Sequence, residues 1–426
     1  MKKFFFFLFF VVFALLGAGM ANAQQQAGVL PYYVKSVAGH DLNLLPVWAH
    51  IGKTLSTERS VARPTLLAIA DGGVSPHGDI SCLDSSRSKS FFPNTYNQRN
   101  DPLVDHIPHG TGLSGVVCGS GREDNTSGVL PFPSVVQVVS LKMADGTWNG
   151  MSLNSTQAEL CLDCVAPAFK YFAGLLEPGE IGIVSNSWGS TGQMLADIHE
   201  SIKTLKDRVL FVFAVGNNGA NTIHDPSRDP DVIAVAALDK YGWVMPDESK
   251  AGEAIAWFSN WSPAADNLIF AYGSNFKVAY PGGYYAFAQG TSQATPTVAA
   301  LAAYLVWEAR QQGIKPTTAM IRKAIFDGSK RILVYAGRTF FEADFFDPAN
   351  FSWVKKADWE GSRQALQKAI DAIKAQIKVQ DPPPAAPPAI NPPAAPPGDT
   401  GAAFLPASSP SRTESESRPN SGGRSN

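Results

Sequence analysis

Continuous apolar runs recur along the first half of the chain and predict the strands of a buried sheet. Each run is rich in Val, Ile, Leu or Ala, and most lead into a turn that contains glycine. Strands of a parallel sheet that are covered on both faces have this pattern. The predicted strands cover residues 64–70, 135–141, 181–186, 209–215 and 231–237.

Segments with helical periodicity separate and follow these runs. Apolar residues at spacings of three and four predict helices over 157–176, 197–207, 292–306, 317–326 and 361–379, with a short helix over 46–52 and a tightly packed one over 109–117. Residues 75–105 read as a long loop, and residues 330–355 fit no single pattern. Strands that alternate with helices predict an α/β fold, a three-layer sandwich around a mostly parallel sheet.

The N-terminus has the features of a secretory signal peptide. Two lysines precede an apolar run over residues 4–16, which is too short for a comfortable membrane span, and Ala21-Asn22-Ala23 matches a cleavage site. We expect cleavage before Gln24, a secreted or periplasmic protein, and no stable membrane anchor afterwards. The alternative is an uncleaved N-terminal anchor.

The C-terminus changes character after residue 380. Residues 381–397 contain nine prolines, and the remainder is rich in Ser, Arg, Glu and Gly, which predicts a disordered tail. This tail is a solvated segment, a spacer or a partner-binding region. The expected organisation is a signal peptide (1–23), a short extension (24–45), a catalytic domain (46–345), a helical extension (346–380) and the Pro-rich tail (381–426).

The charge balance and the cysteines narrow the function classes. A net charge of −2 without a basic cluster argues against nucleic-acid binding. Outside the cytosol, Cys82, Cys118, Cys161 and Cys164 are expected to form disulfides, and three pairings are open. A single C-x-x-C, at residues 161–164, favours a structural bridge over a redox site and does not suggest zinc.

Ser292 is the candidate nucleophile. It precedes an apolar helical run and should lie at a helix N-terminus, where the backbone N–H groups and the helix dipole favour negative charge. Such a serine is also a favoured helix cap, so a catalytic role requires further residues.

Three polar residues at the ends of predicted elements supply what a serine nucleophile needs. Asp71 and Asn217 follow strands, and His109 begins a segment of small residues; His106 is a rival without the following Gly-Thr. Histidine can take the serine proton, aspartate can orient the imidazole, and an asparagine amide can bind an oxyanion. The carboxyl ends of parallel strands bring such residues to one edge of the sheet.

These residues and their flanks resemble the subtilisin-like (subtilase) serine peptidases, over residues 60 to about 330. The order Asp…His…Ser is that of the family, and five segments match its motifs. They are Asp71-Gly72-Gly73, His109-Gly110-Thr111-Gly112-Leu113-Ser114-Gly115, Ser187-Trp188-Gly189, Ala214-Val215-Gly216-Asn217 and Gly290-Thr291-Ser292-Gln293-Ala294-Thr295-Pro296.

The resemblance implies an endopeptidase on a mostly parallel sheet of about seven strands. It assigns Asp71, His109 and Ser292 as the catalytic triad and Asn217 as the oxyanion donor. A protein or peptide substrate would bind as an extended strand along Ser187, Trp188 and Gly189 and along Ala214, Val215 and Gly216. The floor of the S1 pocket, which receives the side chain before the cleaved bond, should come from residues 224–228, and Trp188 should narrow the subsites.

The resemblance also bears on cofactors and assembly. No cofactor is required and no metal ligands are assigned, although structural calcium is frequent in the family. We expect a monomer.

Three residues depart from the family pattern. Gly72 replaces a usual Ser or Thr, Gly112 a frequent His, and Gln293 a frequent Met. The segment from Gln24 to Asp71 is too short for an inhibitory pro-domain plus the usual leading helix. Either folding needs no intramolecular chaperone or another chain takes that role, and we expect a protein that begins at Gln24 to fold and to be active.

Two other functions fit parts of the pattern. A catalytically silent subtilase-fold binding protein need not retain all four of Asp71, His109, Asn217 and Ser292. An esterase on an α/β sheet requires a G-x-S-x-G elbow and the order Ser…Asp…His, which this chain lacks.

Overall fold

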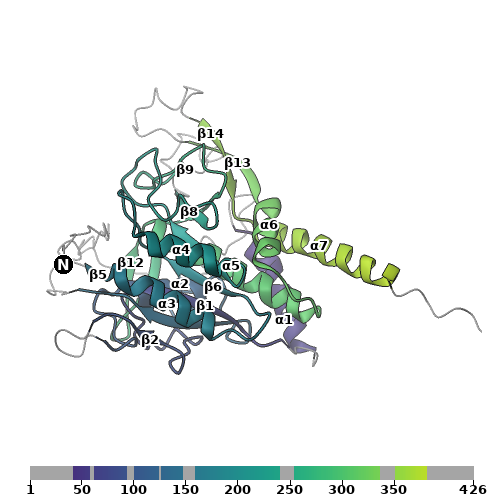
Figure 1. Ribbon diagram of the computed structural model, residues 1–426, viewed down its shortest axis with the longest axis horizontal. Helices are drawn as coiled ribbons and strands as arrows, with labels where there is room; N and C mark the ends of the chain where they lie inside the picture. The colour runs from purple at the N-terminus through teal and green to yellow at the C-terminus, as the bar shows by residue number, and fades with distance from the viewer. Residues whose placement is uncertain are drawn as a thin grey trace, which may run out of the picture. The chain divides into compact units, whose positions relative to one another are not determined.

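A ten-stranded sheet forms the centre of the protein in the computed structural model (Figure 1), which describes residues 42–57, 62–93, 100–123, 126–146, 159–239, 254–335 and 351–380. The strand order is β10-β14-β13-β9-β8-β7-β6-β1-β3-β2, and β8 also pairs with β10. The strands are β1 (Thr65–Asp71), β2 (Lys89–Ser90), β3 (Val136–Lys142), β6 (Gly182–Asn186), β7 (Val209–Ala214), β8 (Ile233–Asp239), β9 (Ala254–Ile255), β10 (Leu268–Tyr272), β13 (Lys330–Tyr335) and β14 (Phe351–Lys356).

The sheet is mostly parallel, as the apolar runs predicted, but it is larger than about seven strands. The strands β2, β3, β1, β6, β7, β8 and β10 pair in parallel, whereas β8–β9 and β13–β14 pair antiparallel. The hairpin of β13 and β14 occupies the region without an assigned pattern, 330–355. It adds two strands to the sheet and places a strand in the segment, 346–380, that was expected to be a helical extension.

Helices cover both faces of the sheet and make three layers (Figure 1). They are α1 (Leu44–Ser56), α2 (His109–Cys118), α3 (Leu162–Gly174), α4 (Ala196–Leu205), α5 (Thr291–Gln311), α6 (Thr318–Gly328) and α7 (Trp359–Gln380). Along β1, Leu66, Ala68 and Ala70 pack with α3 and α4, and Leu67 and Ile69 pack with α2 and α5. This alternation explains why the strand is apolar at every position.

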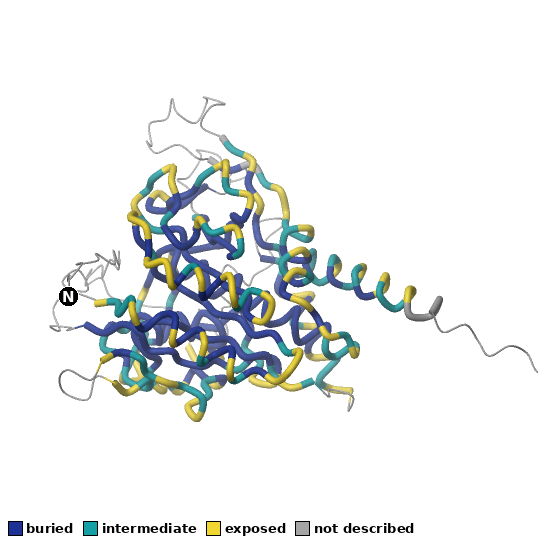
Figure 2. Tube along the Cα trace, in the orientation of Figure 1, coloured by how far each residue is buried: buried dark blue, intermediate teal, exposed yellow. Residues whose placement is uncertain are grey.

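The long helix α5 lies in the core and carries Ser292 in its first turn. Every residue from Thr291 to Ala309 is buried, and Figure 2 shows the buried residues gathered in the interior around the sheet. A helix that is apolar around its whole circumference is buried on all sides. The N-terminus of α5 is therefore held firmly at the edge of the sheet.

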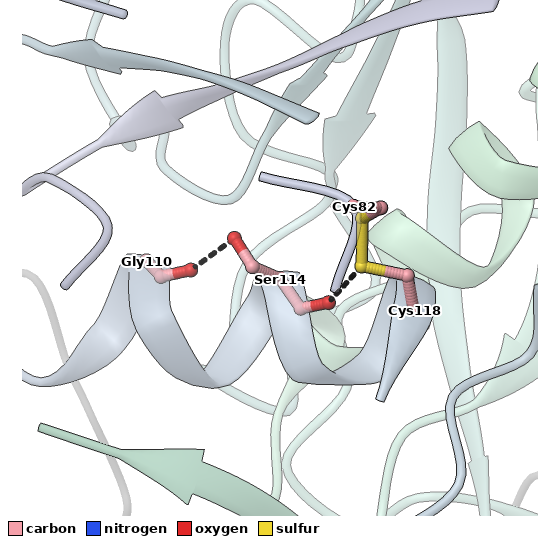
Figure 3. Close-up of a disulfide and its surroundings, with 4 residues drawn as sticks. All are labelled: Cys82, Gly110, Ser114 and Cys118. Atoms are coloured by element: carbon pink, nitrogen blue, oxygen red, sulfur yellow. Dashed lines mark hydrogen bonds between the residues drawn. A yellow bond between two sulfur atoms is a disulfide. The ribbon is translucent and has the colours of Figure 1, made fainter. Parts of the chain in front are cut away.

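Helix α2 packs closely against a small hairpin of β11 (Phe276–Tyr280) and β12 (Tyr284–Ala288). Cβ atoms at Gly112 and Gly115 would lie 3.1 Å from atoms of Val278 and Ala279, so larger residues would push the helix off β11. A disulfide between Cys82 and Cys118 anchors the last turn of α2 (Figure 3).

The second disulfide joins Cys161 and Cys164 at the start of α3, which completes the pairing that the sequence left open. The predicted helix 157–176 begins later than expected because Glu159 and Leu160 form β5, which pairs with β4 (Ala144–Asp145). Among the described helices, none has the length and apolarity to cross a membrane.

The chain divides into two units, Met1–Ile377 and Lys378–Asn426. The first contains the sheet and its helices. Of the second, only the last residues of α7 are described. The predicted signal peptide, most of the predicted extension and the Pro-rich tail lie outside the described residues, and those assignments stay predictions.

Candidate active site

Asp71 and His109 form a buried pair at the carboxyl end of β1. His109 Nδ1 lies 3.0 Å from Asp71 Oδ1 and 2.9 Å from Oδ2, and the Gly72 N–H donates to Oδ1 at 2.8 Å. The close approach depends on Gly110, because a Cβ there would lie 2.2 Å from the Gly73 carbonyl oxygen. Glycines thus let the first turn of α2 rest directly on the turn after β1.

A second buried carboxylate, Asp105, supports the start of α2. Its Oδ2 accepts hydrogen bonds from the N–H and the hydroxyl of Thr111, both at 2.8 Å, and its Oδ1 accepts from the Ile107 N–H at 3.1 Å. Burial, with a smaller contribution from the charge of Asp71, raises the pKa of Asp105 to about 6.

The sequence showed Asp105 four residues before His109 but gave it no role. Gly72 explains its proximity to the pair: a Cβ at Gly72 would lie 3.3 Å from Asp105 Oδ1 and 2.8 Å from Ile107 Cδ1. The space left by the missing Ser or Thr side chain is therefore taken by Ile107 and Asp105.

His106, the rival base, also contacts a carboxylate. Its Nδ1 lies 3.0 Å from Asp145 Oδ1, and its side chain is 40% exposed. The same oxygen of Asp145 is 3.5 Å from the buried Lys142 Nζ, which donates to the Val104 carbonyl at 2.7 Å. This group of charges supports the segment that carries Asp105.

Ser292 reaches the same edge of the sheet through the segment after β6. The Ser292 hydroxyl donates to the Ser187 carbonyl at 3.4 Å, and the Ser187 hydroxyl donates to the Ser292 carbonyl at 3.0 Å. The Trp188 indole donates to the Ala70 carbonyl at 3.0 Å, one residue before Asp71. These contacts join the start of α5 to the end of β1.

Asn217 and the Ser292 backbone N–H both border the position that a Cβ would occupy on Gly290, which we call the gap beside Gly290. Asn217 Oδ1 accepts from the Thr291 N–H at 2.8 Å and from its hydroxyl at 2.9 Å, which turns Nδ2 the other way. A Cβ at Gly290 would lie 3.2 Å from Asn217 Nδ2 and 3.5 Å from Ser292 N. Gly290 has φ 155° and ψ 164°, a conformation that is essentially restricted to glycine. Two donors therefore converge where a glycine leaves room.

The predicted substrate-binding segments end neighbouring parallel strands: Ser187–Gly189 follows β6, and Ala214–Gly216 spans the end of β7. The expectation that Trp188 narrows the subsites is wrong. Its ring is buried and packs against Phe213 with the ring centroids 5.1 Å apart, so only its backbone can serve a substrate.

The loop after Asn217 borders both segments. A Cβ at Gly216 would lie 2.5 Å from His224 Nδ1, and the Asp225 backbone exchanges two hydrogen bonds of 2.9 Å with Ser190. Burial, with Arg228 nearby, lowers the pKa of His224. A cavity of about 690 Å³ lies along this loop, lined by His224, Arg228 and Arg322 among others.

The side chains of His199 and Asn267 hold this loop in place. His199 Nε2 lies 2.9 Å from Asp225 Oδ2, and its Nδ1 lies 3.0 Å from Asp229 Oδ2. The Asn267 amide nitrogen donates to the carbonyls of Ser227, Asp229 and Val232 at 2.9, 2.9 and 3.3 Å. We call His199, Asp225 and Asp229 the loop clamp; no pattern in the sequence indicated it.

In the described part of the chain, no group of three or more His, Cys, Asp or Glu side chains is arranged to hold a metal ion. The structural calcium that the family resemblance allows therefore has no assigned ligands.

Comparisons with known proteins match this architecture. The family model described as the subtilase family covers residues 63–339, more than half of the chain. M-protease of Shouchella clausii (strain KSM-K16) is 28% identical over 240 residues, covering 56% of this chain and 52% of that protein. Subtilisin Savinase of Lederbergia lenta is 28% identical over 240 residues, covering 56% of this chain and 74% of that protein.

Two solved structures share the fold. The protease domain of PatA has 20% sequence identity and a TM-score of 0.51, with coverage of 72% of this chain and 96% of that domain. The prenylagaramide maturation protease PagA has 21% identity and a TM-score of 0.51, with coverage of 74% and 98%. The chain thus spans about half of M-protease but nearly all of these two structures.

Proposed function

Because the chain belongs to the subtilase family, we propose that it is a serine endopeptidase that cleaves peptide bonds through an acyl-enzyme on Ser292. The observation that carries this proposal is the gap beside Gly290. Two hydrogen-bond donors converge there, next to a serine at a helix N-terminus and on the same sheet edge as a buried Asp–His pair.

His109 acts as the general base and Asp71 orients it. Both oxygens of Asp71 lie on Nδ1, which fixes the proton there and leaves Nε2 as the basic nitrogen. Nε2 takes the Ser292 proton as Oγ attacks the substrate carbonyl, and returns it to the leaving amine. Water then attacks the acyl-enzyme by the same route.

Asn217 Nδ2 and the Ser292 N–H stabilise the oxyanion of the tetrahedral intermediate. Both donors are fixed before substrate binds, Asn217 by Thr291 and Ser292 by α5, so no reorganisation is needed when charge develops. The N-terminus of α5 adds its dipole at the same place.

The substrate binds as an extended strand between Ser187–Gly189 and Ala214–Gly216. Backbone groups at these strand ends supply hydrogen bonds that tolerate many sequences. The side chain before the cleaved bond points towards the loop that carries His224 and Arg228. His224 lies against Gly216, and this contact sets the depth of the proposed S1 pocket.

The working environment in this proposal is outside the cytosol. The predicted signal peptide and the two disulfides support it. The proposed enzyme is a monomer and needs no cofactor, and structural calcium, if bound, lies on its loops.

A fluorophosphonate probe tests the proposal. Wild-type protein should be labelled covalently and should cleave casein, and Ser292→Ala should abolish both while its melting temperature stays unchanged. Ser329→Ala, which alters a serine at the end of α6, is the matched control and should keep full labelling. Folded wild-type protein that takes no label and leaves casein intact would instead favour the alternative, a catalytically silent subtilase-fold binding protein.

A further inference from the structure

Gln293 follows the proposed nucleophile, and its side-chain amide is buried without a use in the mechanism above. The residue is only 4% exposed, and its Oε1 has no hydrogen-bond partner among the described residues. Leaving a buried polar atom unsatisfied typically costs about 1–3 kcal/mol. A methionine would fill a similar volume without this cost, so packing alone does not explain a glutamine here.

The amide of Gln293 faces the gap beside Gly290. The three atoms nearest to a Cβ placed at Gly290 are all polar: Gln293 Oε1 at 3.1 Å, Asn217 Nδ2 at 3.2 Å and Ser292 N at 3.5 Å. The amide therefore borders the same volume as the two proposed oxyanion donors. It approaches from the α5 side, whereas Asn217 approaches from the end of β7.

We propose that Gln293 is a catalytic residue whose side-chain amide provides a third donor to the oxyanion. The inference rests on the proposed function, because it requires an acyl transfer at Ser292. The oxygen and nitrogen of a glutamine amide exchange places when the terminal torsion rotates by 180°, and this torsion has a broad, roughly two-fold preference. The rotation turns Nε2 towards the developing negative charge.

Gln293 gains and loses no proton in this step. The Ser292 Oγ–carbon bond forms, the carbonyl π electron pair moves onto the oxygen, and the Oγ proton passes to His109. On collapse the pair returns, the carbon–nitrogen bond breaks, and His109 protonates the amine. The Gln293 N–H stabilises only the charged intermediate and its flanking transition states, so it raises kcat more than it lowers KM.

Gln293→Met separates donation from packing. We expect kcat for a peptide amide substrate to fall about 10- to 100-fold, somewhat less than is typical for loss of a principal donor, with KM within about two-fold. Affinity for a peptide aldehyde, whose adduct carries the same oxyanion, should fall in proportion. Gln364→Met, an exposed glutamine on α7, is the control and should match wild type. Melting temperatures verify that both variants are folded.

Gln293→Glu should give a pH dependence of the rate that a change in packing alone would not produce. A carboxylate beside the oxyanion repels it, so the rate relative to wild type should be lowest above pH 7 and should rise as the pH falls and the carboxyl group is protonated. In an Asn217→Ala background, Gln293→Met should lower kcat by a different factor than it does in wild type, because both side chains serve one oxyanion.

The outcomes distinguish this inference from the function on which it rests. Wild-type protein without peptidase activity overturns both. Active wild-type protein whose kcat and aldehyde affinity are unchanged in Gln293→Met, or a Gln293→Glu/wild-type rate ratio that is flat with pH, overturns the third donor and leaves the peptidase in place.

Discussion

Two histidines in this protein are held by aspartates at nearly equal distances, yet the arrangements are suited to different tasks. At the candidate active site, His109 receives both oxygens of Asp71 on one ring nitrogen, Nδ1. In the loop clamp, His199 has Asp229 on Nδ1 and Asp225 on Nε2. The first arrangement orients an imidazole as a base, and the second uses both nitrogens as donors.

Burial and charge separate the two histidines further. The His109 side chain is 6% exposed, and that of His199 is 28% exposed. Burial lowers the pKa of His199, but its hydrogen bonds to Asp229 and Asp225 together with their charges outweigh this and raise the pKa overall. Two carboxylates, one on each ring nitrogen, favour the protonated imidazole, an arrangement suited to a structural ion pair. A His–Asp contact therefore indicates catalysis only where a nucleophile and oxyanion donors lie beside it.

The two regions are nevertheless connected through the segments proposed to bind substrate. Asp225, which His199 holds, pairs with the backbone of Ser190, and the adjacent His224 lies against Gly216. The loop clamp thus supports a wall of the proposed S1 pocket from behind. In the proposed enzyme the candidate site performs the chemistry, and the loop clamp supports the proposed S1 pocket.

The largest expected effect is on activity and separates the two histidines directly. His109→Gln should lower kcat/KM by about 10⁴-fold or more, because the proposed base is lost. His199→Gln should lower it by no more than a few-fold, mainly through KM, since only the support of the pocket changes. Steady-state kinetics on one peptide substrate measures both. Equal losses of kcat/KM in the two variants would show that His109 and His199 do not differ in function.

The sequence alone predicts those parts of the candidate site that depend on the hydrophobic pattern of neighbouring residues. Asp71 and Asn217 follow apolar strands, and Ser292 begins an apolar helix, so hydrophobic patterning alone predicts that they meet at one edge of the sheet. The five predicted strands are all present for the same reason. The assignment of Asp71, Asn217 and Ser292 as catalytic groups stays a prediction that the experiments above address.

Features that depend on distant partners could not be predicted. The loop clamp joins residues 26 and 30 positions apart, and nothing in the pattern around His199 distinguishes it from an exposed helix residue. The hairpin of β13 and β14 extends the sheet through pairing with β9 and β10, which composition does not specify. Asp105 was visible in the sequence, but its role depends on the space beside Gly72.

Asp105 sharpens the comparison because its charge is costly to bury and lies beside the Asp71–His109 pair. Its pKa of about 6, raised mainly by burial, exceeds the unfolded value near 3.8, so the native state binds this proton more tightly. Native stability should therefore fall as the pH rises from about 4 to about 6, by up to roughly 3 kcal/mol from this group. Asp105→Asn removes that dependence.

Urea denaturation at several pH values between 4 and 7 tests the role of Asp105. As the pH rises across this range, the unfolding free energy of wild type should fall relative to that of Asp105→Asn. Asp101→Asn, which alters an exposed aspartate of the same segment, is the matched control. Parallel stability curves for wild type and Asp105→Asn would show that Asp105 ionises normally in the folded protein.

The smallest expected effect belongs to the loop clamp. Because the pKa of His199 is raised in the folded state, its stabilising contribution is complete below about pH 6.5, the unfolded value, and is lost as the pH rises through the folded value. His199→Gln should therefore lower the unfolding free energy by about 1 kcal/mol at pH 5.5, a modest figure because the pair is partly solvent-screened. At pH 9 the two proteins should be nearly equal in stability, since a neutral imidazole can donate to only one of the two carboxylates. A loss of equal size at both pH values would mean that His199 supports the loop by packing, and the contrast with His109 would then rest on geometry rather than on charge.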